Sequence, residues 1–395
     1  MNPSIFMVGW EYPPHNSGGL GVACDGLSKA LSDAGNQIYF ALPYQHSKSL
    51  AHLEFIACHD PKWLEFTKAP FPSYATKKNA QRVDFLPLAQ IEQKVAEYAN
   101  MISKKSKKYE KKYDLIHAHD WMSFPAAQKM KNQTGKPMLA HVHSTEFDRI
   151  PRGSGSNFIK RAEYQGMQAA DLIVAVSHYT KQVLIDKYDV DADKIKVVHN
   201  GIEPLKQSSV ELIHFAASRP LLVFMGRLTA QKGAKYFVDL AAAVLEDLPD
   251  ALFVLAGNGD QYQSLLFKAA GNQLSASVLF SGFLRGREKE ILLSRADIFV
   301  MPSVSEPFGL VAAEAAQRAV PVIISKNSGV AELLSDAIQV DFWNIDEMKA
   351  QILKVINNKK YSQSIVKKQN QNLKNISWEN TAKRLRDLYK DVLSR

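Results

Sequence analysis

Two glutamates flank the predicted start of a helix in the C-terminal half of the chain. Glu306 lies in a loop after the apolar run 297–302, and Pro307 disfavours helical geometry at that position. From Leu310 an alanine-rich run predicts a helix, and Glu314 lies inside it. The free N–H groups at a helix N-terminus bind phosphate, so carboxylates on either side of them suit the sugar and the ribose of a nucleotide-sugar. An ordinary crossover loop with two surface glutamates is the alternative for this pair alone.

Two basic residues bracket another loop between a predicted strand and a helix. Arg227 and Lys232 follow the apolar run 221–225, and Gly233 ends the loop. Two cations fixed at the start of a helix can neutralise a departing diphosphate. The alternative is a surface loop whose charges face water.

Polar residues end two predicted strands in the N-terminal half. They are His117, His119, Asp120 and Trp121 in the first stretch, and His141 and His143 in the second. Ligands of open parallel sheets gather at the carboxyl ends of the strands, so both stretches are candidates for a binding site. Residues two apart on a strand share a face, so the four histidines are also a competing candidate for a metal site.

A glycine-rich stretch, 11–21, separates the first predicted strand, 5–8, from a predicted helix, 22–34. Glycines at the first crossover of a parallel sheet let a ligand approach the backbone closely. The stretch lacks the GxGxxG fingerprint of dinucleotide-binding proteins, so the sequence gives only weak support to a redox function.

Five of these stretches, in this order along the chain, resemble motifs of the retaining GT-B glycosyltransferases, in particular family 4 and the glycogen and starch synthases. They are Gly18-Gly19-Leu20, His119-Asp120-Trp121, His143, the loop from Arg227 to Lys232, and the pair Glu306 and Glu314. The turn Asn200-Gly201 resembles the segment that ends the first domain of that family. The motifs are specific for this class of enzyme and less specific for its substrate.

The resemblance implies a role for each matched residue. The implied catalytic residues are His143, Arg227, Lys232 and Glu306, and the implied substrate-binding residues are Gly18, Gly19, Asp120, Gly309, Leu310 and Glu314. Arg227 and Lys232 would contact the donor phosphates, Glu306 the donor sugar and Glu314 the ribose. Asp120 and His143 would line the site of the transferred sugar. No metal and no cofactor are needed if the two cations stabilise the leaving group.

Length and pattern predict an α/β protein with two domains, since 395 residues exceed one typical core. The resemblance implies two Rossmann-like domains that face each other across a cleft. We expect an N-terminal acceptor-side domain at 1–205 and a nucleotide-sugar-binding domain at 206–375. Residues 376–395 are expected to form an amphipathic helix that crosses back to the first domain.

The formal net charge is +9, which suits anionic partners such as nucleotides or an acidic membrane. The densest cluster of lysines lies in a predicted helix, 91–112, which is either a solvated helix face or a membrane-surface helix. Two cysteines and the lack of a secretion signal or an apolar run of membrane-spanning length favour a cytoplasmic protein.

We therefore expect a retaining, metal-independent hexosyltransferase that moves glucose from UDP- or ADP-glucose to an α-glucan, as in glycogen synthesis. Its expected partners are the nucleotide-sugar and a glycan acceptor, and not nucleic acid. One alternative is a family 4 enzyme that acts on a cell-surface polysaccharide or lipid-linked acceptor at the membrane, with peripheral contact through helix 91–112. Others are a phosphorylase, a nucleotide-sugar epimerase, and a catalytically silent scaffold that binds glycan.

Overall fold

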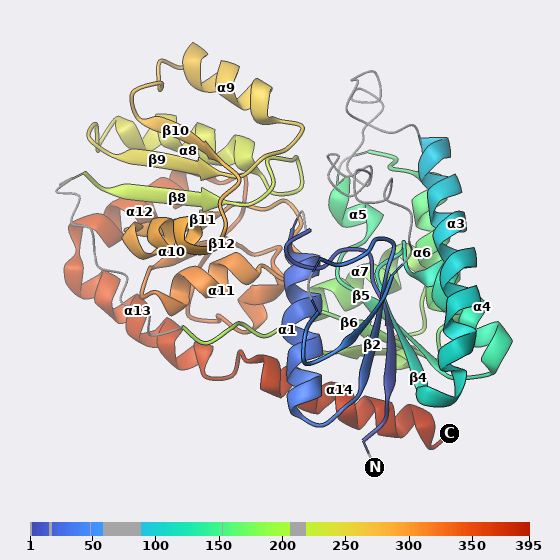
Figure 1. Ribbon diagram of the computed structural model, residues 1–395. Coiled ribbons are helices and arrows are strands. Elements are labelled where there is room, and N and C mark those ends of the chain that lie inside the picture. The colour runs from blue at the N-terminus through green and yellow to red at the C-terminus, as the bar shows by residue number, and fades with distance from the viewer. Residues whose placement is uncertain (1, 16–17, 48, 58–87, 152, 206–218) are drawn as a thin grey trace. The chain divides into compact units, whose positions relative to one another are not determined.

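The computed structural model describes residues 2–15, 18–47, 49–57, 88–151, 153–205 and 219–395 (Figure 1). The chain divides into two compact units. The first unit contains Met1–Gly201 together with Ser377–Arg395, and the second contains Ile202–Ile376. Each unit is a parallel sheet with helices packed on it, so the α/β prediction with two Rossmann-like domains is confirmed.

The sheet of the first unit has seven strands in the order β3-β2-β1-β4-β5-β6-β7. The strands are β1 (Ile5–Val8), β2 (Ile38–Leu42), β3 (Glu54–Ala57), β4 (Leu115–His119), β5 (Met138–Val142), β6 (Leu172–Ala175) and β7 (Ile195–Val197). All neighbours are parallel, and the direction of winding reverses between β1 and β4. Ligands of open α/β sheets bind at the carboxyl ends of the strands beside such a reversal.

The helices of the first unit include the last helix of the chain. They are α1 (Gly19–Asp33), α3 (Leu88–Ser106), α4 (Phe124–Thr134), α5 (Glu146–Arg149), α6 (Asn157–Ala169), α7 (His178–Tyr188) and α14 (Trp378–Leu393), with 3-10 turns η2 (Lys107–Lys112) and η3 (Ala192–Lys194). Helix α14 packs on α1, where a Cβ at Gly26 would lie 2.2 Å from the ring of Trp378. The prediction that the C-terminal helix returns to the first domain is confirmed.

Three local expectations differ from the structure. Helix α1 begins at Gly19 rather than at Val22, so the glycine pair forms its N-terminus. Strand β3 lies in a stretch that showed no strand pattern, because it has only four residues and only Ile56 among them is buried. The apolar pattern of residues 83–88 also predicts a short strand, but this stretch falls mainly outside the described residues, and Leu88 begins α3.

The sheet of the second unit has six parallel strands in the order β10-β9-β8-β11-β12-β13. The strands are β8 (Leu221–Met225), β9 (Leu252–Ala256), β10 (Val278–Gly282), β11 (Ile298–Met301), β12 (Val322–Ser325) and β13 (Ile338–Val340). The helices are α8 (Ala234–Leu245), α9 (Tyr262–Gly271), α10 (Gly286–Arg295), α11 (Leu310–Gln317), α12 (Ile345–Asn357) and α13 (Lys359–Leu373), with a 3-10 turn η4 (Gly329–Glu332). The winding reverses between β8 and β11, so the loops after these two strands lie at the switch point.

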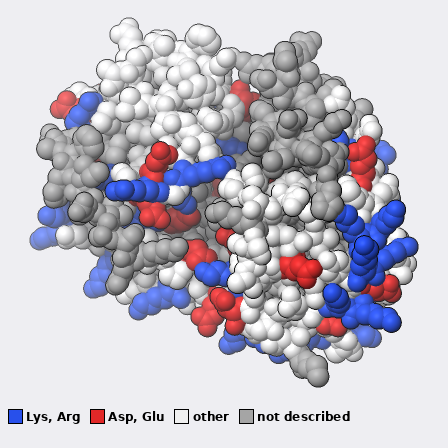
Figure 2. Space-filling view, in the orientation of Figure 1, with Lys and Arg blue, Asp and Glu red and all other residues white. Residues whose placement is uncertain are grey.

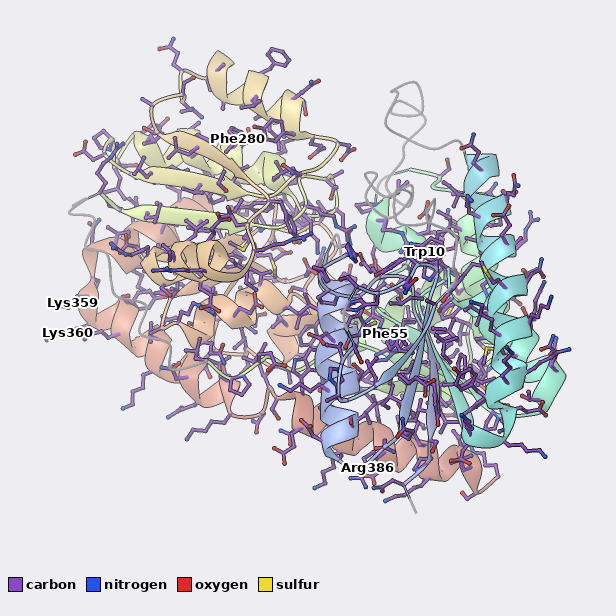
Figure 3. All side chains as sticks on the ribbon, in the orientation of Figure 1. Trp10, Phe55, Phe280, Lys359, Lys360 and Arg386 are labelled. Atoms are coloured by element: carbon purple, nitrogen blue, oxygen red, sulfur yellow. The ribbon has the colours of Figure 1, made fainter. Side chains whose placement is uncertain are left out.

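Apolar side chains fill the interior of each unit, as Figure 3 shows for Trp10. The Trp10 ring meets the Tyr98 ring edge-on at a centroid distance of 5.5 Å. Lys359 and Lys360, at the start of α13, point outward in the same view. Among the described residues, no helix combines the length and the apolar composition that crossing a membrane requires.

The basic helix keeps its apolar side chains inside the protein. Ile91, Val95, Tyr98 and Ile102 of α3 are buried, and the Tyr98 hydroxyl donates to the carbonyl oxygen of Gly9 at 2.6 Å. The lysines of α3 and η2 face outward, and Figure 2 shows them gathered on the side where α3 lies. Among the described residues of α3, the side chains of this apolar stripe are therefore occupied by packing inside the protein and do not form a face that could insert into a bilayer.

Candidate active site

Two loops at the switch point of the second unit contact each other through their backbones. The β8–α8 loop meets the β11–α11 loop, where the Val304 N–H donates to the carbonyl oxygen of Gln231 at 2.9 Å. Gly233 has φ +68°, and a Cβ there would lie 1.9 Å from the carbonyl oxygen of Pro302. Only glycine fits this contact, so the approach of the two loops depends on that residue.

The contact joins two of the predicted catalytic residues. The ammonium group of Lys232 lies 2.8 and 2.7 Å from the two carboxylate oxygens of Glu306. Ser303 also donates its hydroxyl to Glu306, at 3.1 Å. Glu306 is 5% exposed, so its charge is held by this cation and this hydroxyl rather than by water. Arg227 lies half-buried at the start of the same loop.

A third loop, which sequence analysis did not include in the site, holds the backbone of Glu306. The N–H of Glu306 donates to the carbonyl oxygen of Asn327 at 2.9 Å. The carbonyl oxygen of Glu306 accepts from the N–H of Gly329, also at 2.9 Å. Both partners follow β12, the next strand of the sheet. A glycine shortly after a predicted strand is the only signal that could have indicated this loop.

Helix α11 begins directly after these contacts. Gly309 precedes it with φ +107°, which L side chains rarely adopt, and Leu310 is its first residue. Glu314 accepts a hydrogen bond from Lys289 of α10 at 2.8 Å through one carboxylate oxygen. Its other oxygen is buried without a hydrogen-bond partner among the described residues. Lys289 is a second residue that sequence analysis missed, because the contact joins two helices.

In the first unit, Gly18 and Gly19 begin α1 directly after the loop that follows β1. The positive end of the dipole of this fifteen-residue helix favours an anion at its N-terminus. Asp120, after the neighbouring strand β4, has φ +60°. The structure thus places the glycine pair and Asp120 after the two strands between which the winding reverses.

Asp120 accepts hydrogen bonds from the next loop of the sheet. Its Oδ1 lies 2.7 Å from the backbone nitrogen of His143 and 3.3 Å from that of Ser144. Burial raises the pKa of the Asp120 carboxyl group to about 7, although the Arg149 guanidinium and these two N–H donors oppose the rise. The group therefore changes its charge near neutral pH.

The four histidines form two hydrogen-bonded rows on one face of the sheet. In the first row, His117 Nδ1 lies 2.7 Å from the hydroxyl of Tyr389 in α14, and His117 Nε2 lies 3.1 Å from His141 Nδ1. In the second, His119 Nδ1 lies 3.1 Å from His143 Nε2. Burial lowers the pKa of His117 to about 3 and those of His119 and His141 well below the usual value, so these rings are neutral.

This array also tests the competing metal site. Ligand nitrogens of His117, His119 and His141 lie within 4.8 Å of one another. Tetrahedral zinc with Zn–N bonds of about 2.0–2.1 Å brings its nitrogens to about 3.4 Å. Both ring nitrogens of His117 are already in hydrogen bonds, so its lone pair is not free for a metal ion. The described geometry fits a hydrogen-bonded scaffold better than a metal centre.

Comparison with family models divides the chain much as the fold does. Residues 17–206 match the model described as Glycosyltransferase Family 4, and residues 212–372 match Glycosyl transferases group 1. An uncharacterized glycosyltransferase from Methanocaldococcus jannaschii is 28% identical, with 98% of this chain and 97% of that protein covered. A glycogen synthase from Mycobacterium tuberculosis is also 28% identical, over 83% of this chain and 79% of that enzyme. Among solved structures, sucrose-phosphate synthase from Thermosynechococcus elongatus has a TM-score of 0.79 at 18% identity, with 99% of both chains covered.

Proposed function

Because the chain belongs to the family 4 glycosyltransferases with the GT-B fold, we propose that it transfers glucose from a nucleotide-sugar to an α-glucan with retention at the anomeric carbon. The nucleotide is UDP or ADP. The observation that carries the proposal is the Lys232–Glu306 contact at the switch point of the second unit. It brings a fixed cation and a fixed carboxylate together at the place where α/β sheets bind ligands.

In the proposed reaction, Lys232 and Arg227 stabilise the negative charge that develops on the departing nucleoside diphosphate. Glu306, held by Ser303 and by the loop after β12, positions the donor sugar and stabilises positive charge at its anomeric carbon. No metal ion or cofactor has a role in this scheme, since the two cations take the part that a divalent ion plays elsewhere.

Glu314 binds the ribose in this proposal. Its free oxygen is a buried acceptor without a partner among the described residues, and a ribose hydroxyl satisfies such an atom. Lys289 fixes the carboxylate through the other oxygen. The N–H groups of Gly309 and Leu310, at the start of α11, face the donor phosphates. In the first unit, Gly18 and Gly19 at the start of α1 bind phosphate in this proposal, and Asp120 and His143 orient the transferred sugar.

We propose the class of the sugar acceptor from proteins that are similar in sequence to this chain. A glycogen synthase covers most of the chain, which favours an α-glucan acceptor. The test is to incubate the protein with UDP-glucose or ADP-glucose, with and without glycogen or maltooligosaccharide. We expect glucose incorporation with one donor, and product analysis should show α-linkages. Hydrolysis of the donor without incorporation contradicts the glucan assignment, and failure of both donors to bind contradicts the proposed donor.

A lipid-linked acceptor at a membrane is the second candidate. A relative named UDP-Gal:alpha-D-GlcNAc-diphosphoundecaprenol alpha-1,3-galactosyltransferase from Escherichia coli is 26% identical over 71% of this chain. The exposed lysines of α3 and η2 supply the charge for an electrostatic contact with anionic lipid. Flotation with acidic vesicles separates the candidates: binding that is lost at high salt favours the membrane acceptor, and no binding at low salt favours the glucan.

A further inference from the structure

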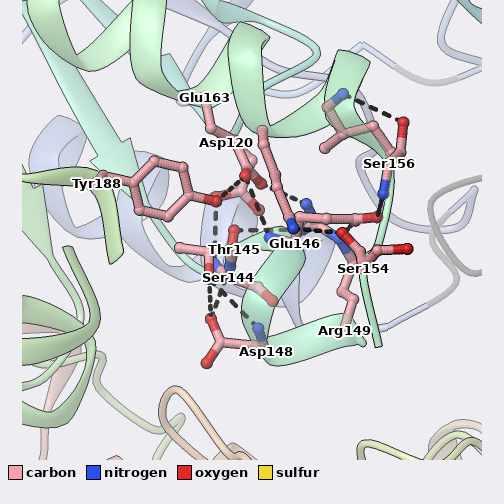
Figure 4. A network of polar contacts seen from close by, with 12 residues as sticks. Asp120, Ser144, Thr145, Glu146, Asp148, Arg149, Ser154, Ser156, Glu163 and Tyr188 are labelled. Carbon is pink, nitrogen blue, oxygen red and sulfur yellow. Dashed lines mark hydrogen bonds and ion pairs between the residues drawn. The ribbon is translucent and has the colours of Figure 1, made fainter. Parts of the chain in front are cut away.

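One buried guanidinium group in the first unit faces several carboxylates (Figure 4). Arg149, at the end of α5, is 6% exposed, and Glu146 and Glu163 beside it are buried more completely. Arg149 forms ion pairs with both glutamates. Asp120 lies close enough for the same guanidinium to affect its ionisation. Buried charges are costly unless they are paired, so a guanidinium group shared between two buried glutamates is a costly arrangement that calls for a functional explanation.

Arg149 holds the turn that joins β5 to α5. Its Nε donates to Glu146 Oε2 at 3.2 Å, and its Nη1 donates to the carbonyl oxygen of Ser144 at 3.3 Å. The same turn begins with His143 and Ser144, whose N–H groups donate to Asp120. The turn is therefore fixed on one side by Asp120 and on the other by Arg149.

Two further helices anchor the guanidinium. Glu163 of α6 accepts from Arg149 Nη2 and from the hydroxyl of Tyr188 in α7. It also accepts from the N–H of Glu146, at 3.2 Å. Because α6 and α7 are long elements packed on the sheet, the position of Arg149 is set by the body of the unit and not by the turn alone.

The electrostatic effect on Asp120 comes from a small number of groups. Arg149 opposes protonation of its carboxyl group, and Glu11, from the loop after β1, favours it. Burial raises the pKa of the Cys24 thiol on α1, and the charges of Glu11 and Asp120 raise it further, so the thiol stays neutral. The His143 ring lies on the turn itself. Arg149 is thus the positive group that acts on this carboxyl group.

We propose that Arg149 is a positioning residue of the sugar site: it holds the turn that carries His143 and the two N–H groups donated to Asp120, and it thereby favours the ionised form of Asp120. The inference rests on the proposed function, in which Asp120 and His143 contact the transferred sugar. An ionised Asp120 accepts hydrogen bonds from sugar hydroxyls, whereas a protonated one donates one and leaves the His143 and Ser144 N–H groups with a weaker acceptor.

The test compares Arg149→Met, which removes the charge, with Arg149→Lys, which keeps it. The readouts are the carboxyl ¹³C titration of Asp120, assigned with Asp120→Asn, and the pH profile of kcat/KM. We expect the Asp120 midpoint and the acidic limb of the profile to rise by about one pH unit or more in Arg149→Met. In Arg149→Lys we expect little change in the Asp120 midpoint, because the positive charge remains. We expect kcat to fall about tenfold, because an ammonium group cannot reproduce the planar hydrogen-bonding geometry by which the guanidinium group binds its three acceptors.

Two further variants keep the test decisive. Arg149→Gln also removes the charge but keeps an amide N–H that can donate to Ser144, and it stands in if Arg149→Met does not fold. Arg161→Met removes an exposed cation from the same helix as Glu163 and should leave the midpoint unchanged. An unchanged Asp120 midpoint in folded Arg149→Met or Arg149→Gln, or an equal rise in Arg161→Met, overturns the inference. If the wild-type protein turns over no nucleotide-sugar, the proposed function fails, and the titration still decides whether Arg149 controls Asp120.

Discussion

Replacement of Lys232 by alanine separates the proposed catalytic role of this residue from its effect on stability. Glu306 is 5% exposed and receives both short contacts of the Lys232 ammonium group, at 2.7 and 2.8 Å. Without Lys232 the carboxylate retains only the Ser303 hydroxyl, at 3.1 Å, among the side-chain contacts described here. Breaking a buried ion pair from one side costs roughly 3–5 kcal/mol. The Lys232 side chain is 19% exposed, so we expect the lower end, about 3 kcal/mol.

Two companion variants define the measurement. Lys235→Ala removes a lysine from the next turn whose side chain is 56% exposed and pairs with Asp239, so it should cost less than about 0.5 kcal/mol. The double variant Lys232→Ala/Glu306→Gln no longer buries an unpaired charge. Its free energy of unfolding should therefore be about 2 kcal/mol higher than that of Lys232→Ala. Chemical denaturation at pH 7 gives the free energies of unfolding.

The activities of these variants should rank differently from their stabilities. Lys232→Ala should lower kcat by about 100-fold or more, because a fixed group that stabilises transition-state charge is lost. The double variant should be as inactive as the single one, although it is more stable. Wild-type turnover by folded Lys232→Ala refutes the leaving-group role, and wild-type stability of that variant refutes the view that Glu306 depends on Lys232 for its charge.

Three further outcomes follow from the same structure. Gly233→Ala should lower the free energy of unfolding by at least about 2 kcal/mol, because φ is +68° and the new Cβ meets Pro302. Gly135→Ala, where φ is +69° and the space around the new Cβ is open, should lower it by only about 1 kcal/mol. Equal losses in denaturation experiments contradict the loop contact. Glu314→Gln should raise the KM for the donor by about tenfold with little change in kcat, and an unchanged KM removes Glu314 from the ribose site. Stability should fall as the pH is lowered from 6.5 towards 4, by up to about 2.7 kcal/mol per pH unit, because unfolding lets four buried histidines take up protons while two buried carboxyl groups release theirs. The histidines are His117, His119, His141 and His143, and the carboxyl groups are those of Asp120 and Glu163, whose pKa values are raised to about 7. Denaturation curves that show equal or greater stability at pH 5 than at pH 6.5 contradict the buried neutral histidines.

The sequence by itself predicted most elements that carry the site. Apolar runs identified β1, β8 and β11, because strands that are buried on both faces read as continuous hydrophobic stretches. Glycine and proline identified the loops after them, and the alanine-rich run identified α11. Those signals are local, so they survive without any knowledge of what packs against what.

The tertiary structure decided which side chains meet. The pairs Lys232–Glu306 and Lys289–Glu314 join residues that lie 74 and 25 positions apart, and no local pattern encodes such contacts. The contact of Tyr389 with His117 joins residues 272 positions apart, because the last helix of the chain packs on the first unit. Arg149 gave no signal in the sequence, since its proposed importance comes from the carboxyl groups of Asp120 after β4, Glu146 on α5 and Glu163 on α6, which only the fold brings together. Spacing along the chain thus determined where the site lies, and packing between elements determined the charges and hydrogen bonds that equip it for chemistry.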